Sequence, residues 1–144
     1  DVPDALPTRL GGRAAFLRVW HASCAEEKGM NTQTHLHRFR AFSMSLNIIR
    51  ALKPLCGQVR RFDASLAKQL RTSASSVSLN LAESRGRVGK DRIHFFRIAA
   101  GSAEEVMGCL LVAEAWGHLG ESDIAEIIEQ VEHLVNMLRR LQRA

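Results

Sequence analysis

The sequence predicts an all-α protein, an antiparallel up-down-up-down four-helix bundle, on two observations. The 144 residues contain three prolines, two of them among the first seven positions, so the rest of the chain is nearly free of a residue that costs about 3 kcal/mol inside a helix. From residue 34 onward, apolar residues recur every three or four positions in four successive blocks, which is the period of amphipathic helices. Short connections between the blocks force neighbouring helices to run antiparallel.

The first two helices are expected over residues 35–53 and 63–84. Pro54 and Gly57 should end the first helix, and Asp63 should cap the start of the second. Both helices carry an apolar stripe that is expected to face a common core. These stripes are Phe39, Phe42, Leu46, Ile49 and Leu52 in the first helix, and Leu66, Leu70, Ala74, Val77 and Leu81 in the second.

The third and fourth helices are expected over residues 91–117 and 122–142. The third is apolar on more than one side, which is typical of a helix that is central in a core or buried between subunits. In the fourth, Asp123 and Glu126 have the spacing of a capping box. Its stripe is regular and contains Ile124, Ile127, Ile128, Val131, Leu134, Val135, Leu138 and Leu141.

The chain is expected to have two parts, a peripheral segment at residues 1–29 and a bundle domain at residues 30–144. The first part is rich in proline and glycine, and no apolar period lasts beyond a turn or two. We expect it to be flexible and to derive from cloning or from upstream sequence, with Met30 as a candidate start.

Composition favours a cytoplasmic protein. The cysteines, Cys24, Cys56 and Cys109, are odd in number, far apart and without a C-x-x-C pair, so neither a zinc site nor a disulfide framework is indicated. Free thiols fit a reducing cytosol. No stretch reaches the ~18 apolar residues that a membrane span needs, so no membrane association is expected.

Charge is distributed unevenly along the chain. Residues 38–97 contain thirteen Lys or Arg residues and three acids, whereas residues 104–132 contain eight acids and no Lys or Arg. The basic half could attract a phosphate backbone, or it could meet the acidic half of another subunit. Two solvated faces of opposite sign are the third interpretation.

The densest basic cluster lies in the predicted turn between the second and third helices. Arg85, Arg87, Lys90 and Arg92 fall within eight residues there, together with two glycines that let backbone N–H groups approach an anion. The segment is not a Walker A loop, because its spacing differs and no strand precedes it. It is a candidate for phosphate contacts.

A set of polar residues accompanies this cluster along the second helix. Glu83 and Arg87 have the i,i+4 spacing of a surface ion pair. Asn80 is expected to be half-buried and to fix helix register. Arg71 and Arg87 have an alternative role as phosphate contacts.

No catalytic or metal site is apparent in the pattern. A di-metal bundle needs a Glu-x-x-His from each of two helices, and the sequence has none. The hydroxyl-rich run Ser73–Ser78 has no histidine nearby in sequence and is better explained by close helix packing. We therefore expect no enzyme, no cofactor, no metal and no small-molecule substrate.

Several segments together resemble the bacterial four helix bundle protein family, whose members include proteins encoded within intervening sequences of large-subunit (23S) ribosomal RNA genes. The accessory variability determinant proteins of diversity-generating retroelements are similar. The segments that carry the resemblance are Gln69–Val77, Asn80–Glu83, Gly86–Arg87, Phe95–Glu105 and Met137–Leu138. The resemblance covers about residues 36–141 and departs at Ser84, where the family usually has glycine.

The resemblance implies a ring-like homopentamer of four-helix bundles. Its retroelement members are basic and bind nucleic acid and a reverse transcriptase, whereas for the intervening-sequence members it implies no defined activity. The matching positions look mostly structural and are Gln69, Arg71, Ser73, Asn80, Glu83, Gly86, Arg87, Gly101, Ser102 and Glu105.

Two functions are therefore expected from the sequence. The first is a non-enzymatic homo-oligomeric adaptor that binds RNA or DNA through its basic half. The second is a purely structural scaffold that binds itself or another protein. The place of the cations in the oligomer distinguishes the two. Clustering in a solvent-filled pore or rim would favour nucleic acid, whereas pairing with Glu126, Glu129 or Glu132 of a neighbouring copy would favour the scaffold. The cations are Arg38, Arg40, Arg60, Arg61, Arg85, Arg87, Lys90 and Arg92.

Overall fold

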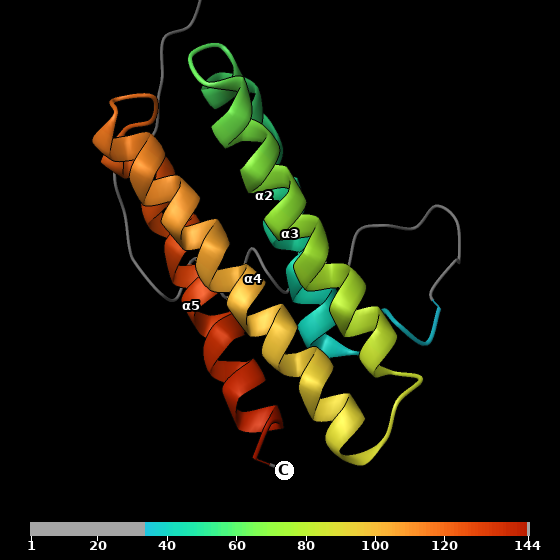
Figure 1. Ribbon diagram of the computed structural model, residues 1–144. Helices are drawn as coiled ribbons and strands as arrows, with labels where there is room; N and C mark the ends of the chain where they lie inside the picture. The colour runs from blue at the N-terminus through green and yellow to red at the C-terminus, as the bar shows by residue number, and fades with distance from the viewer. Residues whose placement is uncertain (1–33, 144) are drawn as a thin grey trace, which may run out of the picture. The chain divides into compact units, whose positions relative to one another are not determined.

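The structure is a computed structural model that describes residues 34–143, which belong to the unit Gln33–Ala144 (Figure 1). These residues form four α-helices and no strand, which confirms the predicted all-α class. The helices are α2 (Arg40–Arg60), α3 (Ala64–Ser84), α4 (Gly89–Ala115) and α5 (Glu121–Leu141). Residues 1–29, and with them the predicted domain boundary, lie outside the described residues.

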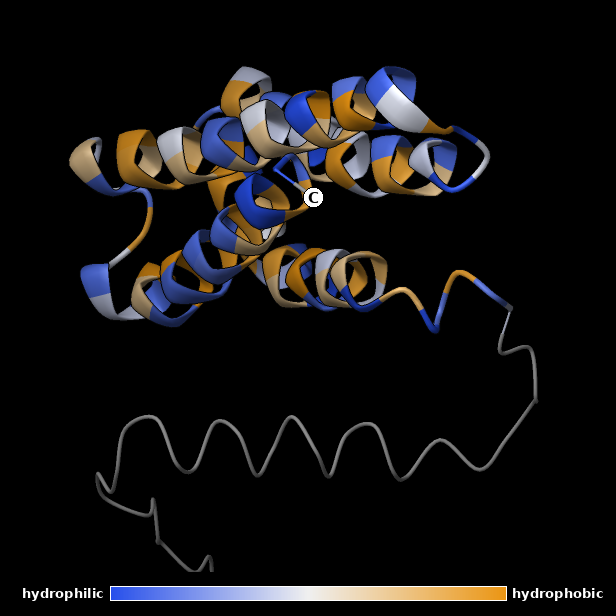
Figure 2. Ribbon diagram, turned by 90° about the horizontal axis from the view of Figure 1, so that it is seen from below, coloured by the Kyte–Doolittle hydropathy of each residue, from blue (hydrophilic) through white to orange (hydrophobic). Residues whose placement is uncertain are grey.

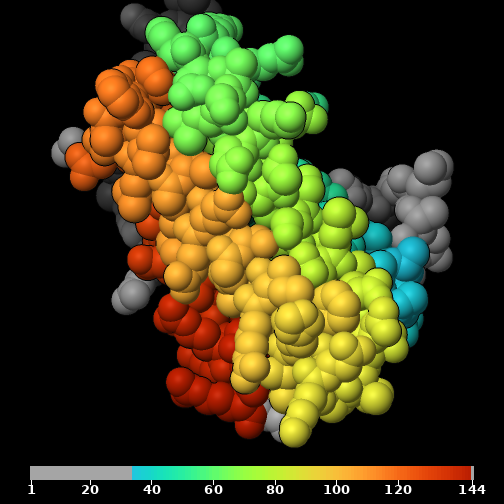
Figure 3. Space-filling model, in the orientation of Figure 1, coloured from blue at the N-terminus to red at the C-terminus, as the bar shows by residue number. Residues whose placement is uncertain are grey.

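Consecutive helices run in opposite directions and form two layers. Figures 1 and 2 show α3 and α4 side by side in one layer, with α2 and α5 in the other. The packing is most extensive between α3 and α4 and least extensive between α2 and α5. In the space-filling view, α3 and α4 together form one face of the bundle (Figure 3).

Leucine supplies the bulkiest side chains of the core. The bulkiest fully buried side chains among the described residues are Leu52, Leu70, Leu81, Leu110, Leu134 and Leu138. Hydrophobic and hydrophilic residues alternate around the helices in Figure 2, as amphipathic helices require. Burial at about 25 cal/mol per Å² of apolar surface is thus the main force that holds the bundle together.

The buried face of α2 differs from the predicted stripe. Met44, Ile48, Leu55 and Val59 point into the core together with Leu52, whereas the predicted Phe42, Leu46 and Ile49 are only half-buried. α2 carries two apolar stripes, each with helical spacing, so the period alone could not decide between them. Packing against α3 and α5 decides which of the two stripes is buried.

The predicted end of the first helix is also wrong. α2 begins at Arg40 rather than residue 35, and it continues through Pro54 to Arg60. A proline inside a helix costs about 3 kcal/mol or more. The following turn buries Leu55 and Val59, and each fully buried side chain of this size contributes about 1.5–3 kcal/mol, so burial outweighs the cost.

The helix caps confirm one prediction and correct another. Asp63 caps α3 as predicted, because its carboxylate accepts a hydrogen bond from the Leu66 backbone N–H at 2.8 Å. Asp123 does not act as an N-cap with Glu126 as its partner. α5 begins at Glu121, so Asp123 occupies the third helical position and accepts from the Gly120 backbone N–H at 2.9 Å.

Glycine is required at two turns. Gly89 has φ 55° at the start of α4, and Gly117 has φ 72° after α4. Side chains rarely adopt this left-handed region, so glycine lets the chain reverse at both points. None of the described helices is long and apolar enough to cross a membrane.

Candidate nucleic-acid interface

The antiparallel topology brings four helix ends together. The start of α2, the end of α3, the start of α4 and the end of α5 all lie at the lower end of the bundle in Figure 1. We call residues 38–40, 83–97 and 139–143 at this place the basic end. Its acids are Glu83 and Asp91, and its cations are Arg38, Arg40, Arg85, Arg87, Lys90, Arg92, Arg97, Arg139, Arg140 and Arg143.

Not every cation predicted to act together lies at this end. Arg60 is the last residue of α2 and Arg61 follows it, so both lie at the opposite end of the bundle. Arg71 is exposed in the middle of α3. The basic half of the sequence is thus divided in space, and the predicted cluster at residues 85–92 is the part that stays together.

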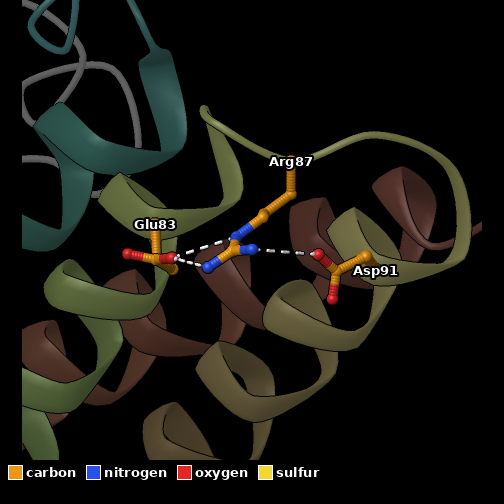
Figure 4. Close-up of polar contacts among 3 residues, drawn as sticks. All are labelled: Glu83, Arg87 and Asp91. Carbon is orange, nitrogen blue, oxygen red and sulfur yellow. Dashed lines mark hydrogen bonds and ion pairs between the residues drawn. The ribbon is translucent and has the colours of Figure 1, made fainter.

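Arg87 links the two helices on either side of the turn (Figure 4). Its Nη2 lies 2.5 Å from the Glu83 Oε1, and its Nη1 lies 3.5 Å from the Asp91 Oδ2. The hydrogen bonds that Arg87 donates to Glu83, together with the charges of Glu83 and Asp91, raise the pKa of Arg87. The predicted Glu83–Arg87 pair is therefore present. The two carboxylates compensate the positive charge of Arg87, which would otherwise attract a phosphate.

Arg85 and Arg92 also lie against phenylalanine rings, as Arg87 does at 5.5 Å from the centre of the Phe95 ring. The Cζ of Arg85 is 5.3 Å from the centre of the Phe39 ring, and that of Arg92 is 5.4 Å from the centre of the Phe96 ring. The two rings are themselves 6.3 Å apart, centre to centre. Phe39 precedes α2, Arg85 follows α3, and Arg92 and Phe96 belong to α4. We call these four residues the arginine–phenylalanine cluster. Sequence reasoning missed it.

Within the described residues, the two arginines of the cluster have no carboxylate partner, and neither has Lys90. The Nε of Arg92 is buried and has no hydrogen-bond partner among residues 34–143. A buried unpaired donor costs about 1–3 kcal/mol, so Arg92 is not explained by stability alone.

Several polar positions from the segments that carry the family resemblance lie between α3 and α4. Gln69 donates a hydrogen bond to Glu105, and the Ser76 and Ser102 hydroxyls are 2.8 Å apart. Asn80 is half-buried and donates to the Ser76 carbonyl at 2.8 Å within its own helix. Ser76 therefore makes the hydrogen bond between α3 and α4, and Asn80 is hydrogen-bonded to Ser76 within α3.

The two described thiols are buried in the core. Burial raises the pKa of Cys56, and the nearby charge of Arg71 opposes that rise. Burial also raises the pKa of Cys109, as do Glu105 and Cys56. Within the described residues, no group of three or more His, Cys, Asp or Glu side chains could hold a metal ion.

A family profile described as 23S rRNA-intervening sequence protein matches residues 38–140 of the chain. One similar solved structure is a protein of unknown function from the S23 ribosomal protein family of Bacteroides thetaiotaomicron. It is 17% identical, with a TM-score of 0.66, and the match covers 72% of this chain and 99% of that one. At this identity the likeness concerns the fold alone. No curated protein matches the chain.

The Arg92→Met substitution should leave the free energy of unfolding unchanged or raise it by up to about 1 kcal/mol. Methionine keeps an unbranched stem against Phe96, and the loss of a contact between a cation and a ring (about 0.5–1 kcal/mol) is offset by removal of a buried unpaired donor. Urea denaturation followed by circular dichroism measures the change.

The matched control is Arg87→Met, which leaves Glu83 and Asp91 without their shared cation and should lower stability. A larger loss of unfolding free energy in Arg92→Met than in Arg87→Met would contradict this interpretation and make Arg92 a structural residue.

Proposed function

The chain belongs to the 23S rRNA-intervening sequence protein family, and on that premise we propose that it is a non-enzymatic, homo-oligomeric protein that binds nucleic acid through its basic end. The observation that carries the proposal is the group of uncompensated cations at the turn between α3 and α4. Arg85, Lys90 and Arg92 lie within eight residues and have no acidic partner among the described residues.

The arginine–phenylalanine cluster supports phosphate contact in particular. A guanidinium that lies over a phenyl ring uses its flat face, so its edge N–H groups remain available to donate. Phe39 and Phe96 therefore orient Arg85 and Arg92 without using their hydrogen-bond donors, and in Arg92 the donors besides the buried Nε would make the phosphate contact. Contacts of this kind bind phosphate oxygens and carry no sequence information, so we propose binding that is largely independent of sequence.

The remaining helix ends extend the same surface. Arg38 precedes α2 and Arg40 begins it. Arg140 lies in the last turn of α5, and Arg143 follows that helix. Arg139 differs, because its Nη2 donates to Glu104 at 2.6 Å. A surface with several cations and few acids releases counterions when it binds a polyanion, which makes the affinity depend steeply on salt.

Homo-oligomerisation is supported by the exposed face of α4. Ile98, Gly101, Glu105, Gly108 and Val112 recur there at alternating spacings of three and four, and all five are exposed. Beyond its own helix backbone, a Cβ added at Gly101 or Gly108 would have none of the described residues within 4 Å. A mid-helix glycine costs about 1 kcal/mol relative to alanine, and close approach by a helix of a second copy would explain that cost.

The competing proposal is a protein-interaction scaffold without nucleic acid. Exposed apolar side chains favour it, since Leu111 is 53% exposed and Trp116 is 73% exposed. Both proposals include contact between copies, and the number five for the subunits rests on the family resemblance. They differ in what the basic end binds.

Replacing Arg85, Lys90 and Arg92 with alanine should weaken binding by similar factors for unrelated RNA and DNA sequences. Each lost phosphate contact should also reduce the slope of log affinity against log salt by roughly 0.7–0.9. Salt titrations of fluorescent single-stranded and duplex probes measure both quantities.

A control variant with Arg60, Arg61 and Lys68 replaced by alanine loses the same net charge at the other end of the bundle and should keep the wild-type slope. Equal slopes for all three proteins, or no wild-type binding at about 50 mM salt, would favour the scaffold.

The Gly108→Leu substitution should dissociate the homo-oligomer into 16.0 kDa monomers without loss of helix, because the added side chain blocks close approach between copies. Light scattering measures the mass. Gly57→Leu on α2 is the matched control, since that glycine is also helical and its surroundings are equally open. A wild-type protein that is already monomeric at micromolar concentration would refute the oligomer.

A further inference from the structure

A groove lies between α2 and α5, the neighbouring pair with the least extensive packing. It measures about 360 Å³ and is lined by Arg40 from the first turn of α2 and by His133, Asn136, Met137 and Arg140 from α5. The four α5 residues follow one another at spacings of three, one and three, so they share one helix face. Sites for small molecules usually measure about 300–1,000 Å³, and the groove falls in that range.

The lining of the groove is basic. Two guanidinium groups, an imidazole and a side-chain amide supply hydrogen-bond donors, and none of these described lining residues is acidic. Neither arginine has an acid four residues away on its own helix, where a surface ion pair could form. The residue four positions after Arg40 is Met44, and the residue four positions before Arg140 is Asn136.

Within residues 34–143, neither Arg40 nor Arg140 forms an ion pair. The adjacent Arg139 shows the contrast, because it lies 2.6 Å from a carboxylate oxygen of Glu104. Two like charges beside one groove repel each other unless an anion lies between them. The arrangement therefore fits a ligand that carries more than one negative charge.

We propose that this groove binds a phosphate monoester of mononucleotide size. The arginines would hold the doubly charged phosphate through charge-assisted hydrogen bonds, which guanidinium groups form in pairs with phosphate oxygens. The Met137 side chain offers an apolar surface to a base or sugar, and Asn136 offers one donor group and one acceptor to a base edge. Arg40 and Arg140 belong to the basic end, but the groove does not use Arg85, Lys90 or Arg92, so nucleotide binding here can be tested separately from the function proposed above.

Adenosine 5′-monophosphate is the probe, and isothermal titration calorimetry of the full chain is the measurement. We expect saturable binding that weakens by about tenfold or more in the Arg40→Gln, Arg140→Gln double variant. The control double variant, Arg38→Gln with Arg143→Gln, changes the same charge at the same end but does not line the groove, and its affinity should equal that of the wild type. All four side chains are exposed, so both variants should fold, and circular dichroism verifies this.

A phosphate monoester can belong to a free nucleotide or to the end of a nucleic acid. A short RNA with a 5′-phosphate, compared with the same RNA with a 5′-hydroxyl, separates the two sources. A preference for the phosphorylated end that disappears in the groove variant assigns the site to a nucleic-acid end, whereas adenosine monophosphate binding without that preference assigns it to a free nucleotide.

The triple alanine variant at Arg85, Lys90 and Arg92 should bind adenosine monophosphate like the wild type, which separates this site from the basic turn. Two results would overturn the proposal. One is the absence of saturable binding of both the nucleotide and the 5′-phosphorylated RNA. The other is an equal loss of affinity in the groove variant and in its control, which would reduce the effect to net charge.

Discussion

The packing of α3 against α4 is the interaction on which the rest of the structure depends. Small side chains let the two helices approach until the hydroxyls of Ser76 and Ser102 lie 2.8 Å apart, and Gln69 and Glu105 meet on the same pair of helices. At the turn that joins these helices, Arg87 pairs with Glu83 on one side and Asp91 on the other. That placement brings Arg85 over Phe39 and Arg92 over Phe96.

The same antiparallel arrangement determines the electrostatics. Because consecutive helices reverse direction, cations that are far apart in sequence, such as Arg38, Lys90 and Arg140, meet at one end of the bundle. The acids Glu114 and Glu121 lie near the opposite end. The stability of the bundle comes from its leucine core, so the cations at the surface are free to serve binding.

Local patterns in the sequence predicted what depends on local spacing. The helical period identified the four helices, and the Asp63 cap and the Glu83–Arg87 pair follow from residues three or four positions apart. The period could not decide which of two apolar stripes on α2 is buried, nor that burial after Pro54 outweighs the cost of a proline. The contact of Arg92 with Phe96 has i,i+4 spacing and could have been predicted, whereas the contact of Arg85 with Phe39 and the groove at Arg40 and Arg140 join residues that are distant in sequence, so no spacing signals them.

The central claim is that nucleic acid contacts the basic end, and crosslinking tests it most directly. RNA that contains 4-thiouridine is crosslinked to the full chain by light, and the modified peptides are identified by mass spectrometry. We expect crosslinks within residues 38–41, 84–97 and 139–143. Crosslinks concentrated between Glu114 and Glu126 or on the exposed face of α4, or no crosslinks at all, would contradict the claim.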